Sequence, residues 1–487
     1  MEKKKEKMDT IVLYPSPGIG HFISMVELGK RFLTLQDADF SITVLLTQTP
    51  STTTPPISSY ITRVASSHPS ISFLPLLPLS LPLHDATTQD TCGFQPARLN
   101  KPLVHHALSS LSRTSSIRAF ILDFFCTQSL AIAQRLLIPS YFFLPFGASP
   151  LTTLLYFPTL HRLHHDRSFK DLGCQLNVPG FPPFSPTDLP LPIIDRNHAA
   201  YEDFLDVALS IPKADGIIIN SFEALEPRAV EAIRDGSCVT DGPTPPAYCV
   251  GPLLAAERED KETVRSSGCL EWLDLQPSRS VVFLCFGSMG RFSAAQLKEI
   301  AAGLEQSGQR FLWVVRNPPA EKENRKGFWD SEPDLDALLP EGFLDRTEGR
   351  GMVVKGWAPQ VLVLGRESVG GFVTHCGWNS VLESLQAGVP MVAWPLYAEQ
   401  RLNRVFLVEE AKLALPLKAD KHGFVTASEV GKRVRELMES EAGKAVAERT
   451  MGLKEKAAAA LSLGGSSHAA LTELVKLWKP DVSSSFD

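Results

Sequence analysis

The chain has 487 residues, a length that suits two domains better than one. Its formal net charge is -6, with 21% charged residues and no long basic block, which argues against a nucleic-acid partner. No run reaches the roughly 18 apolar residues of a membrane span, and no signal-peptide segment follows the charged residues 2–7, so we expect a cytoplasmic protein without a membrane span.

The first predicted βα unit contains a candidate base. Residues 10–15 (TIVLYP) are an apolar, β-branched run, SPGIGH supplies a turn, and the following apolar positions recur at helical spacing. His21 stands at the start of this helix, where the helix dipole disfavours the imidazolium and favours a neutral ring. The alternative is a helix-capping or merely exposed histidine. We favour a base, because open α/β sheets place their ligands at the carboxyl ends of their strands.

Asp123 is the candidate partner of this histidine. It closes the apolar run AFILD, so it is either the N-cap of the next helix or an orienting group for a nearby base. Because the strand ends of a parallel sheet line up along one edge, we expect Asp123 to approach His21.

The rest of the first domain is rich in aromatic residues. A strand is expected at 40–46, a helix at 94–111 and a proline-rich loop at 178–192. Most aromatic residues belong to cores, but an apolar pocket for a small acceptor would draw on some of them. The expected acceptor-binding residues are Gly18, Ile19, Phe94, Phe125, Phe146 and Leu189, with the aromatic residues of the loop 181–184 as further candidates.

No metal site is expected. His161, His164 and His165 have a spacing that suits a metal ion, but no fourth ligand is evident. The eight cysteines lack CxxC spacing, which favours buried free thiols, such as Cys126 and Cys285, over disulfides or zinc.

A change of composition divides the chain. Residues 254–268 are charged and small, which is typical of a linker, so we predict an N-terminal domain at 1–253, disordered at 1–8, and a C-terminal domain at 269–465. A strand at 280–286 opens the second domain, and Ser288 follows it in a turn expected beneath a nucleotide. Ser288 is not a hydrolase nucleophile, because Phe286 stands where that motif needs glycine.

Residues 357–400 form the most informative stretch. An apolar run at 371–374 breaks at Gly377 and restarts as an amphipathic helix near Ser380. A strand that leads through a glycine turn into a helix N-terminus makes an anion site. His375, Asn379 and Ser380 stand at this turn and can add donors for a diphosphate, with no acidic pair beside them to hold a metal.

Polar and aromatic groups flank this anion site. Upstream, Trp357 and Gln360 offer a face that stacks a nucleobase and an amide that bonds a sugar hydroxyl. Downstream, Glu399 and Gln400 are able to bond sugar hydroxyls. The stretch therefore predicts a binding surface for a nucleotide diphosphate sugar.

The order W-A-P-Q, H-C-G-W-N-S, E-S and E-Q resembles the signature box of the plant secondary-product glycosyltransferases, which use UDP-sugars. The resemblance extends from the first strand to the last helix and implies the GT-B fold. In this fold two Rossmann-like, doubly wound β/α/β domains face each other across a cleft. It also implies that a helix at 466–480 packs back on the first domain, before a tail at 481–487.

The resemblance assigns roles to individual residues. It implies that His21 and Asp123 form a catalytic dyad and that Glu383 bonds the ribose, although Ser380-x-x-Glu383 also fits a helix capping box. Trp378 is either core or part of the sugar pocket, and together with Gln400 it is typical of glucose donors; Glu399 departs from the more common aspartate. The expected donor-binding residues are Ser288, Trp357, Ala358, Gln360, His375, Gly377, Trp378, Asn379, Ser380, Glu383, Tyr397, Glu399 and Gln400.

The resemblance thus implies a monomeric, inverting, metal-independent transferase that moves glucose from UDP-glucose to a phenolic acceptor of the flavonoid, chalcone or dihydrochalcone type. No cofactor beyond this co-substrate is expected. Transfer to an aromatic carbon and a non-catalytic nucleotide-sugar-binding protein are the alternatives. A nicotinamide dehydrogenase is disfavoured, because the second strand ends LLTQT without an acidic residue for a ribose and GIGH lacks the glycine spacing.

Overall fold

The computed structural model describes residues 7–36, 39–49, 55–78, 93–255, 268–319 and 332–479. The chain divides into two compact units, one of Met1–Ala255 with Ala459–Asp487 and one of Ala256–Ala458. The predicted linker, the predicted disordered start and the predicted tail lie wholly or mostly outside the described residues. No helix in the described ranges is long and apolar enough to cross a membrane.

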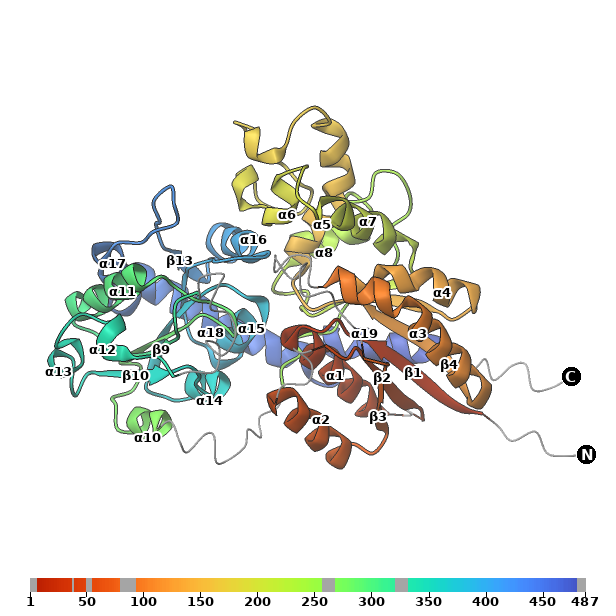
Figure 1. Cartoon of the computed structure of the whole chain (residues 1–487), viewed down its shortest axis with the longest axis horizontal. Coiled ribbons are helices and arrows are strands. Elements are labelled where there is room, and N and C mark those ends of the chain that lie inside the picture. The colour runs from red at the N-terminus through yellow and green to blue at the C-terminus, as the bar shows by residue number, and fades with distance from the viewer. Residues whose placement is uncertain are drawn as a thin grey trace, which may run out of the picture. The chain divides into compact units, whose positions relative to one another are not determined.

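The first unit is built on a seven-stranded parallel sheet in the order β3-β2-β1-β4-β5-β6-β7; Figure 1 labels β1, β2, β3 and β4 of this sheet. Strands β1, β4, β5 and β6 are buried along most of their length, as expected where helices cover both faces of a parallel sheet. The strands are β1 (Met8–Tyr14), β2 (Ser41–Leu46), β3 (Ile71–Pro75), β4 (Ser115–Asp123), β5 (Ser140–Leu144), β6 (Gly216–Ile219) and β7 (Ala247–Cys249).

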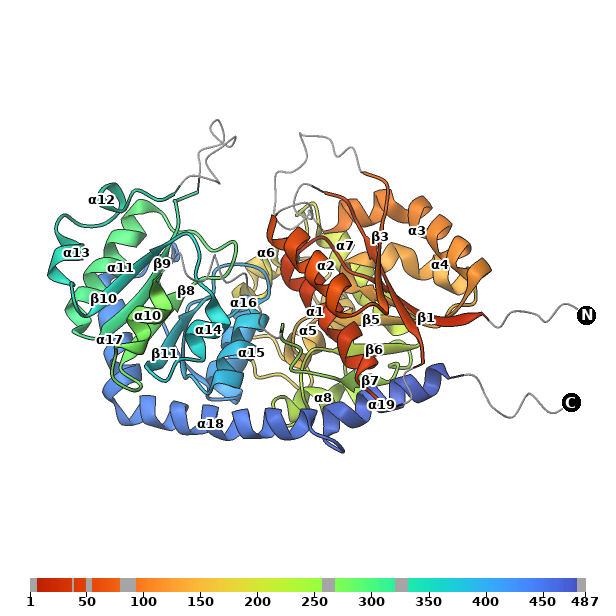
Figure 2. The ribbon, with the colours of Figure 1, turned by 90° about the horizontal axis from the view of Figure 1, so that it is seen from below.

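Helices connect these strands, and the last helix of the chain joins the same core. Trp478 of α19 packs its ring 5.0 Å from that of Phe32 and 5.3 Å from that of Tyr141, and Figure 2 shows α19 beside β7. The helices of this unit are α1 (Ile19–Leu33), α2 (Pro55–Ser67), α3 (Phe94–Thr114), η1 (Phe124–Ser129), α4 (Leu130–Arg135), α5 (Ala148–Leu163), η2 (Phe169–Asp171), η3 (Pro186–Asp188), α6 (Leu191–Ile194), α7 (Tyr201–Ser210), η4 (Ile211–Lys213), α8 (Pro227–Arg234) and α19 (Ser466–Trp478).

The second unit is built on a six-stranded parallel sheet in the order β10-β9-β8-β11-β12-β13. Its strands are β8 (Val281–Cys285), β9 (Arg310–Val315), β10 (Gly351–Lys355), β11 (Val369–Thr374), β12 (Met391–Ala393) and β13 (Ala414–Pro416). Two parallel sheets with helical connections confirm the predicted fold class.

Local signals explain where the helices of the second unit begin and end. Ser293 caps α11 by accepting from Gln296 N–H, and Gly308 ends it at a φ of 71°. The helices are α10 (Cys269–Asp274), α11 (Ala294–Ser307), α12 (Leu335–Leu338), α13 (Phe343–Arg346), α14 (Gln360–Leu364), α15 (Trp378–Ala387), α16 (Gln400–Val405), η6 (Phe406–Glu410), α17 (Ala427–Glu439) and α18 (Glu441–Leu461).

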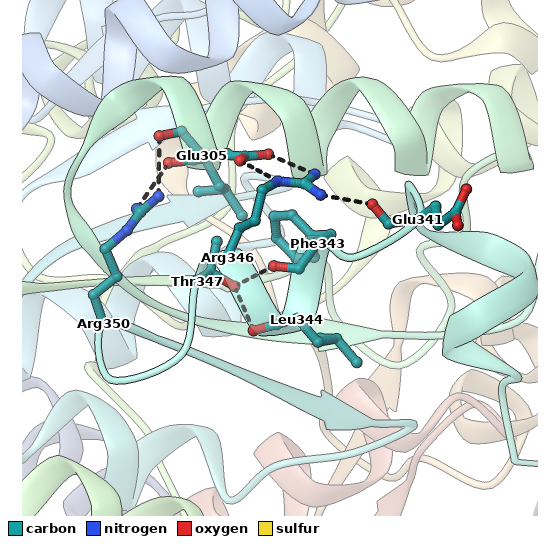
Figure 3. Close-up of polar contacts among 8 residues, drawn as sticks. Glu305, Glu341, Phe343, Leu344, Arg346, Thr347 and Arg350 are labelled. Carbon is teal, nitrogen blue, oxygen red and sulfur yellow. Dashed lines mark hydrogen bonds and ion pairs between the residues drawn. The ribbon is translucent and has the colours of Figure 1, made fainter.

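A charged network fastens α11 to the segment that leads into β10 (Figure 3). Arg346 donates to both carboxylate oxygens of Glu305, at 2.6 and 3.1 Å, and to the carbonyl of Glu341 at 2.7 Å. Arg350 donates to the backbone carbonyl of Glu305 at 3.1 Å. This bidentate pair fixes the approach to β10, whose carboxyl end carries part of the candidate site.

Candidate functional site

His21 and Asp123 meet at the carboxyl edge of the first sheet. β1 and β4 are parallel neighbours, and Tyr14 pairs with Leu122 just before the two strands end. His21, in the first turn of α1, donates from Nδ1 to Oδ2 of Asp123 at 2.7 Å. The Asp123 side chain is fully buried, whereas that of His21 is 26% exposed. The structure therefore brings together the two residues that the sequence pairs, with the imidazole on the accessible side.

Asp123 uses its two oxygens for different partners. While Oδ2 accepts from His21, Oδ1 accepts the backbone N–H of Phe125 at 3.1 Å and caps the 3₁₀ helix η1. One carboxylate thus caps η1 and also accepts from His21; its role as the orienting group of a base stays a prediction.

Aromatic rings surround His21. Its ring centroid lies 5.6 Å from that of Phe124 and 5.5 Å from that of Phe125. Phe146 contacts Phe124 at 5.1 Å, and Phe94 contacts Phe125 at 4.8 Å. Phe204 of α7 adds a further ring, 5.2 Å from Phe94. Three of the predicted acceptor residues thus belong to one aromatic cluster beside the His21–Asp123 pair.

The remaining acceptor candidates have varied surroundings. Gly18 is the N-cap of α1, and a Cβ at this position would lie 3.1 Å from Cδ2 of His21. Ile19 packs against the core of the first unit. Leu189 follows η3 and is buried, and the rings of the buried Phe181 and Phe184 pack on each other at 5.4 Å.

His161 is engaged by other side chains. Its Nδ1 lies 3.0 Å from the hydroxyl of Tyr201 and 2.9 Å from Nη1 of Arg196. Burial and the Arg196 charge lower its pKa. This histidine joins α5 to the segment after α6. Cys126, in η1, and Cys285, in β8, are buried free thiols, as predicted.

In the second unit, β10, β9, β8 and β11 are successive neighbours (Figure 2). The predicted donor residues follow the carboxyl ends of β8, β10, β11 and β12 in the chain. Ser288 follows β8 and is exposed. Trp357 follows β10 and is 42% exposed, so its ring offers an accessible face; Ala358 beside it is 4% exposed. His375 follows β11 and precedes α15.

Two glycines enclose His375. A Cβ on Gly287 would lie 2.5 Å from its Nε2, and a Cβ on Gly377 would lie 2.4 Å from the same atom. The His375 side chain is 6% exposed and its Nδ1 has no hydrogen-bond partner among the described residues. Burial and the positive charge of Arg316 lower its pKa to about 4. At neutral pH the ring is therefore uncharged and donates through one nitrogen only.

Gln360, Ser380 and Glu383 are joined directly. Gln360 Nε2 donates to Ser380 Oγ at 2.8 Å and to Glu383 Oε2 at 2.6 Å. Helix α15 begins at Trp378 after the N-cap Gly377, which makes no side-chain cap. The capping-box alternative is therefore wrong, because Ser380 and Glu383 bond a glutamine of another helix and lie inside α15.

The hexose-reading candidates lie around the start of α16. Gln400 is 3% exposed, and its Oε1 accepts the backbone N–H groups of Leu396 and Tyr397, both at 2.9 Å. Its side chain also hydrogen-bonds the side chain of Tyr397. Glu399 Oε1 accepts from Asn403 Nδ2 at 3.3 Å. The Tyr397 ring lies 6.1 Å from that of His375.

Trp378 and Asn379 are the first two residues of α15 and differ in exposure. Trp378 is 3% exposed, with its ring 6.2 Å from that of Phe406, whereas Asn379 is half-buried. The assignment of Trp378 to the sugar pocket remains a prediction.

Sequence reasoning missed four residues: two rings of the aromatic cluster beside His21 and two polar residues near His375. Phe124 and Phe204 belong to the aromatic cluster, but a helical pattern does not tell which face meets a given strand end. Asn403 Nδ2 donates to the carbonyl of Cys376 at 2.9 Å and supports the turn after His375; its place four residues after Glu399 was the available signal. Arg316 directly follows β9, and its position at a strand end could have marked it.

The comparisons with known proteins agree with these motifs. The family model described as "UDP-glucoronosyl and UDP-glucosyl transferase" matches residues 260–447. Phloretin 2'-O-glucosyltransferase of Malus domestica is 50% identical over 477 residues, which cover 96% of this chain and 99% of that protein. UDP-glycosyltransferase 88F3 of Pyrus communis is 49% identical over 476 residues, covering 96% of this chain and 99% of that protein.

A solved structure extends the likeness to three dimensions. The structure of Phytolacca americana UGT2 complexed with UDP-2fluoro-glucose and pterostilbene matches with a TM-score of 0.85 at 36% identity, covering 96% of this chain and 99% of that chain.

Proposed function

Because this chain belongs to the UDP-glycosyltransferase family, we propose that it transfers glucose from UDP-glucose to a hydroxyl of a phenolic small molecule, with inversion and without a metal ion. The resemblance found in its motifs is thereby confirmed at the level of the family. The names of relatives support the acceptor class: one acts on phloretin, and another is solved with pterostilbene. The observation that carries the proposal is the 2.7 Å hydrogen bond between His21 and the buried Asp123 beside a cluster of aromatic rings.

The hydrogen bond fixes the tautomer of His21. An ionised carboxylate only accepts hydrogen bonds, so the proton of the neutral imidazole resides on Nδ1 and the lone pair on Nε2. Nε2 removes the proton of the acceptor hydroxyl as its oxygen attacks the anomeric carbon. The bond from that carbon to the UDP oxygen breaks, UDP leaves with the electron pair, and Asp123 stabilises the imidazolium.

The donor is held by the strand ends of the second unit. Trp357 stacks the uracil on its exposed face, while Glu383 and Gln360 bond the ribose. The diphosphate binds at the N-terminus of α15, where His375 and the start of the helix donate to it. The N–H groups of Gln400 meet the hexose, since its carbonyl already holds the backbone of the preceding loop.

His375 and the backbone N–H groups at the start of α15 stabilise the leaving UDP. Backbone dipoles and neutral donors that are already in place stabilise developing negative charge without reorganising at the moment of reaction. The proposal therefore assigns no divalent ion to the reaction.

A product screen tests the proposed function. The purified chain is incubated with UDP-glucose and a panel of phenols that includes phloretin, and products are identified by mass spectrometry. We expect O-glucosides, whose glycosidic bond is cleaved by acid. An acid-stable product would instead indicate transfer to carbon, and binding of UDP-glucose without product would indicate a non-catalytic binding protein. His21→Ala is the inactive reference, and His106→Ala, a change at an exposed histidine of α3, is the matched control.

A further inference from the structure

Arg316 links three neighbouring strand ends of the second sheet. It directly follows β9, which lies between β8 and β10. Its Nε donates to the carbonyl of Gly356 at 2.7 Å, and its Nη1 donates to the carbonyl of Gly287. Gly287 follows β8 and Gly356 follows β10. A single side chain therefore connects the turns on both sides of its own strand.

These two turns carry proposed donor contacts. Ser288 comes directly after Gly287, and Trp357 comes directly after Gly356. Both glycines have left-handed backbone angles, with φ of 70° and 75°, which other residues adopt only with strain. The guanidinium ties two turns of unusual shape to each other, and its planar fork suits two acceptors at fixed positions.

The charge of Arg316 has no anionic partner among the described residues. The groups that act on its charge are the Cys285 thiol and the Tyr397 phenol. Burial raises the pKa of the Cys285 thiol, and it raises the pKa of Tyr397 to about 12, so both are neutral at pH 7. Arg291 also lies nearby, and burial and the charge of Arg316 lower the pKa of that guanidinium. Two carbonyl dipoles are the polar contacts of Arg316.

A desolvated charge is normally paired. Burial lowers the pKa of Arg316, which means that its surroundings cost the charged form free energy. The same charge acts on His375, whose Nδ1 is buried and unpartnered among the described residues. Glu383 and Glu399 act on the neighbouring Cys285 and Tyr397 and not on Arg316. A guanidinium without a carboxylate partner, beside a buried imidazole nitrogen without a partner among the described residues, is a position that an anionic ligand can complement.

We propose that Arg316 is a positioning residue of the donor site: it locks the Ser288 and Trp357 turns together and supplies the positive charge that the diphosphate of the donor balances. This inference rests on the proposed function, since it takes the ligand of this edge to be a nucleoside diphosphate. Arg316 affects donor binding through the two turns that it connects and through the electrostatic field of its charge.

Calorimetric titration with UDP and with uridine tests the inference. In Arg316→Gln the charge and the bidentate link are lost, so the dissociation constant for UDP should rise by about 10–100-fold, in line with the loss of hydrogen bonds to charged groups. Uridine carries no phosphate, so its binding should weaken much less. The matched control is Arg310→Gln, at the exposed start of the same strand, which should bind both ligands as the wild type does.

Arg316→Lys separates charge from position. Lysine keeps the charge but presents a point donor in place of a planar fork. We expect this variant to bind both ligands more weakly while keeping the wild-type preference for UDP over uridine. Arg316→Lys also tests the inference if Arg316→Gln does not fold. If Arg316→Lys binds both ligands as strongly as the wild type does, the positioning role is wrong.

The pH titration of His375 gives a readout that a purely structural role would not move. Its imidazole signal is identified by its absence in His375→Gln, and its pKa should rise when Arg316 is replaced by glutamine. An equal loss of UDP and uridine binding in Arg316→Gln, with the His375 titration unmoved, would overturn the inference. If the wild type itself fails to bind UDP, the proposed donor site is wrong and the inference falls with it.

Discussion

Asp123 has donors on both of its oxygens, and this restricts what can replace it. The backbone N–H of Phe125 meets Oδ1, and Nδ1–H of His21 meets Oδ2. An asparagine at this position must turn its NH₂ group toward one of these two donors. A neutral imidazole can change its tautomer, whereas a backbone N–H cannot, so the amide oxygen should stay on Phe125.

Asp123→Asn should therefore leave the His21 ring in its position but move the proton of the ring from Nδ1 to Nε2. Nε2 then carries the hydrogen and cannot act as a base, so kcat should fall by roughly 10²–10⁴. The melting temperature should stay close to that of the wild type. Steady-state kinetics with UDP-glucose and a phenol, together with thermal unfolding, check both statements. Asp206→Asn, an exposed aspartate of α7, is the control, and retention of wild-type kcat in Asp123→Asn would contradict the assigned base.

Gly377→Ala tests the enclosure of His375. The backbone at Gly377 has a φ of -62°, which alanine adopts without strain, so the only obstacle is the new Cβ at 2.4 Å from Nε2 of His375. Gly287 lies against the same nitrogen, so the ring has little room to adjust in place. The ring should be displaced, and the dissociation constant for UDP should rise by about 10–100-fold, as for one lost hydrogen bond to a charged group.

The control for this substitution is Gly452→Ala, because a Cβ at Gly452 meets no atom within 4 Å. It lies inside α18, where alanine is the better helix former, so it should leave UDP binding unchanged and stabilise by roughly 0.5–1 kcal/mol. Wild-type UDP affinity in Gly377→Ala would show that His375 does not contact the diphosphate.

At the scale of elements, Glu226 shows how one helix depends on another part of the chain. Helix α5 begins after Gly147, which offers no side-chain cap. Glu226, the residue before α8, supplies it by accepting from the N–H groups of Ala148 at 2.9 Å and Ser149 at 2.7 Å, and from the hydroxyl of Ser221. This carboxylate is fully buried and fixes the helix that follows Phe146 of the aromatic cluster.

Glu226→Ala should leave these donors buried without an acceptor. The expected loss is about 2–4 kcal/mol in the free energy of unfolding, given the usual cost of an unsatisfied buried group. Urea denaturation measures it. Glu223→Ala removes an exposed ion pair with Arg234 and should change stability by less than about 0.5 kcal/mol. Similar losses in the two variants would show that Glu226 does not cap α5.

The order of strands and helices could be predicted because parallel strands buried on both faces are continuous apolar runs. The turn after β11 could also be predicted, since Gly377 ends the apolar run and a helical pattern begins after it. The exact start of α15 could not, because Ser380 and Glu383 fit a capping box that does not form: the helix begins at Trp378, and Gln360 of a separate helix donates to both side chains. Tertiary contacts here override a local capping pattern.

At the scale of the whole molecule, contacts far apart in sequence were the hardest to predict from residues alone. Ser467 donates to the carbonyl of Gly251 at 2.7 Å, and Trp478 packs on Phe32, so α19 completes a core begun near the N-terminus. Periodicity predicts the helix, but its placement came from the family resemblance. Phe204 reaches the His21 cluster by the same kind of long-range packing, with no local signal.

The two units also differ in how far sequence defines their ligands. The family model matches residues 260–447, which lie within the unit that carries the turns proposed to bind the nucleotide. The aromatic cluster beside His21 belongs to the other unit. General motifs therefore indicate the donor, whereas the proposed acceptor pocket consists of rings whose arrangement only the folded chain establishes.

The central claim is a metal-free, inverting transfer of glucose to a phenolic oxygen. The most direct test is proton NMR of the product formed from UDP-glucose and phloretin in the presence of EDTA. UDP-glucose carries an α-linked sugar, so a single displacement promoted by His21 predicts a β-linked O-glucoside, formed at the same rate with and without the chelator. An α-linked product, or a product that forms only when a divalent ion is restored, would contradict the account.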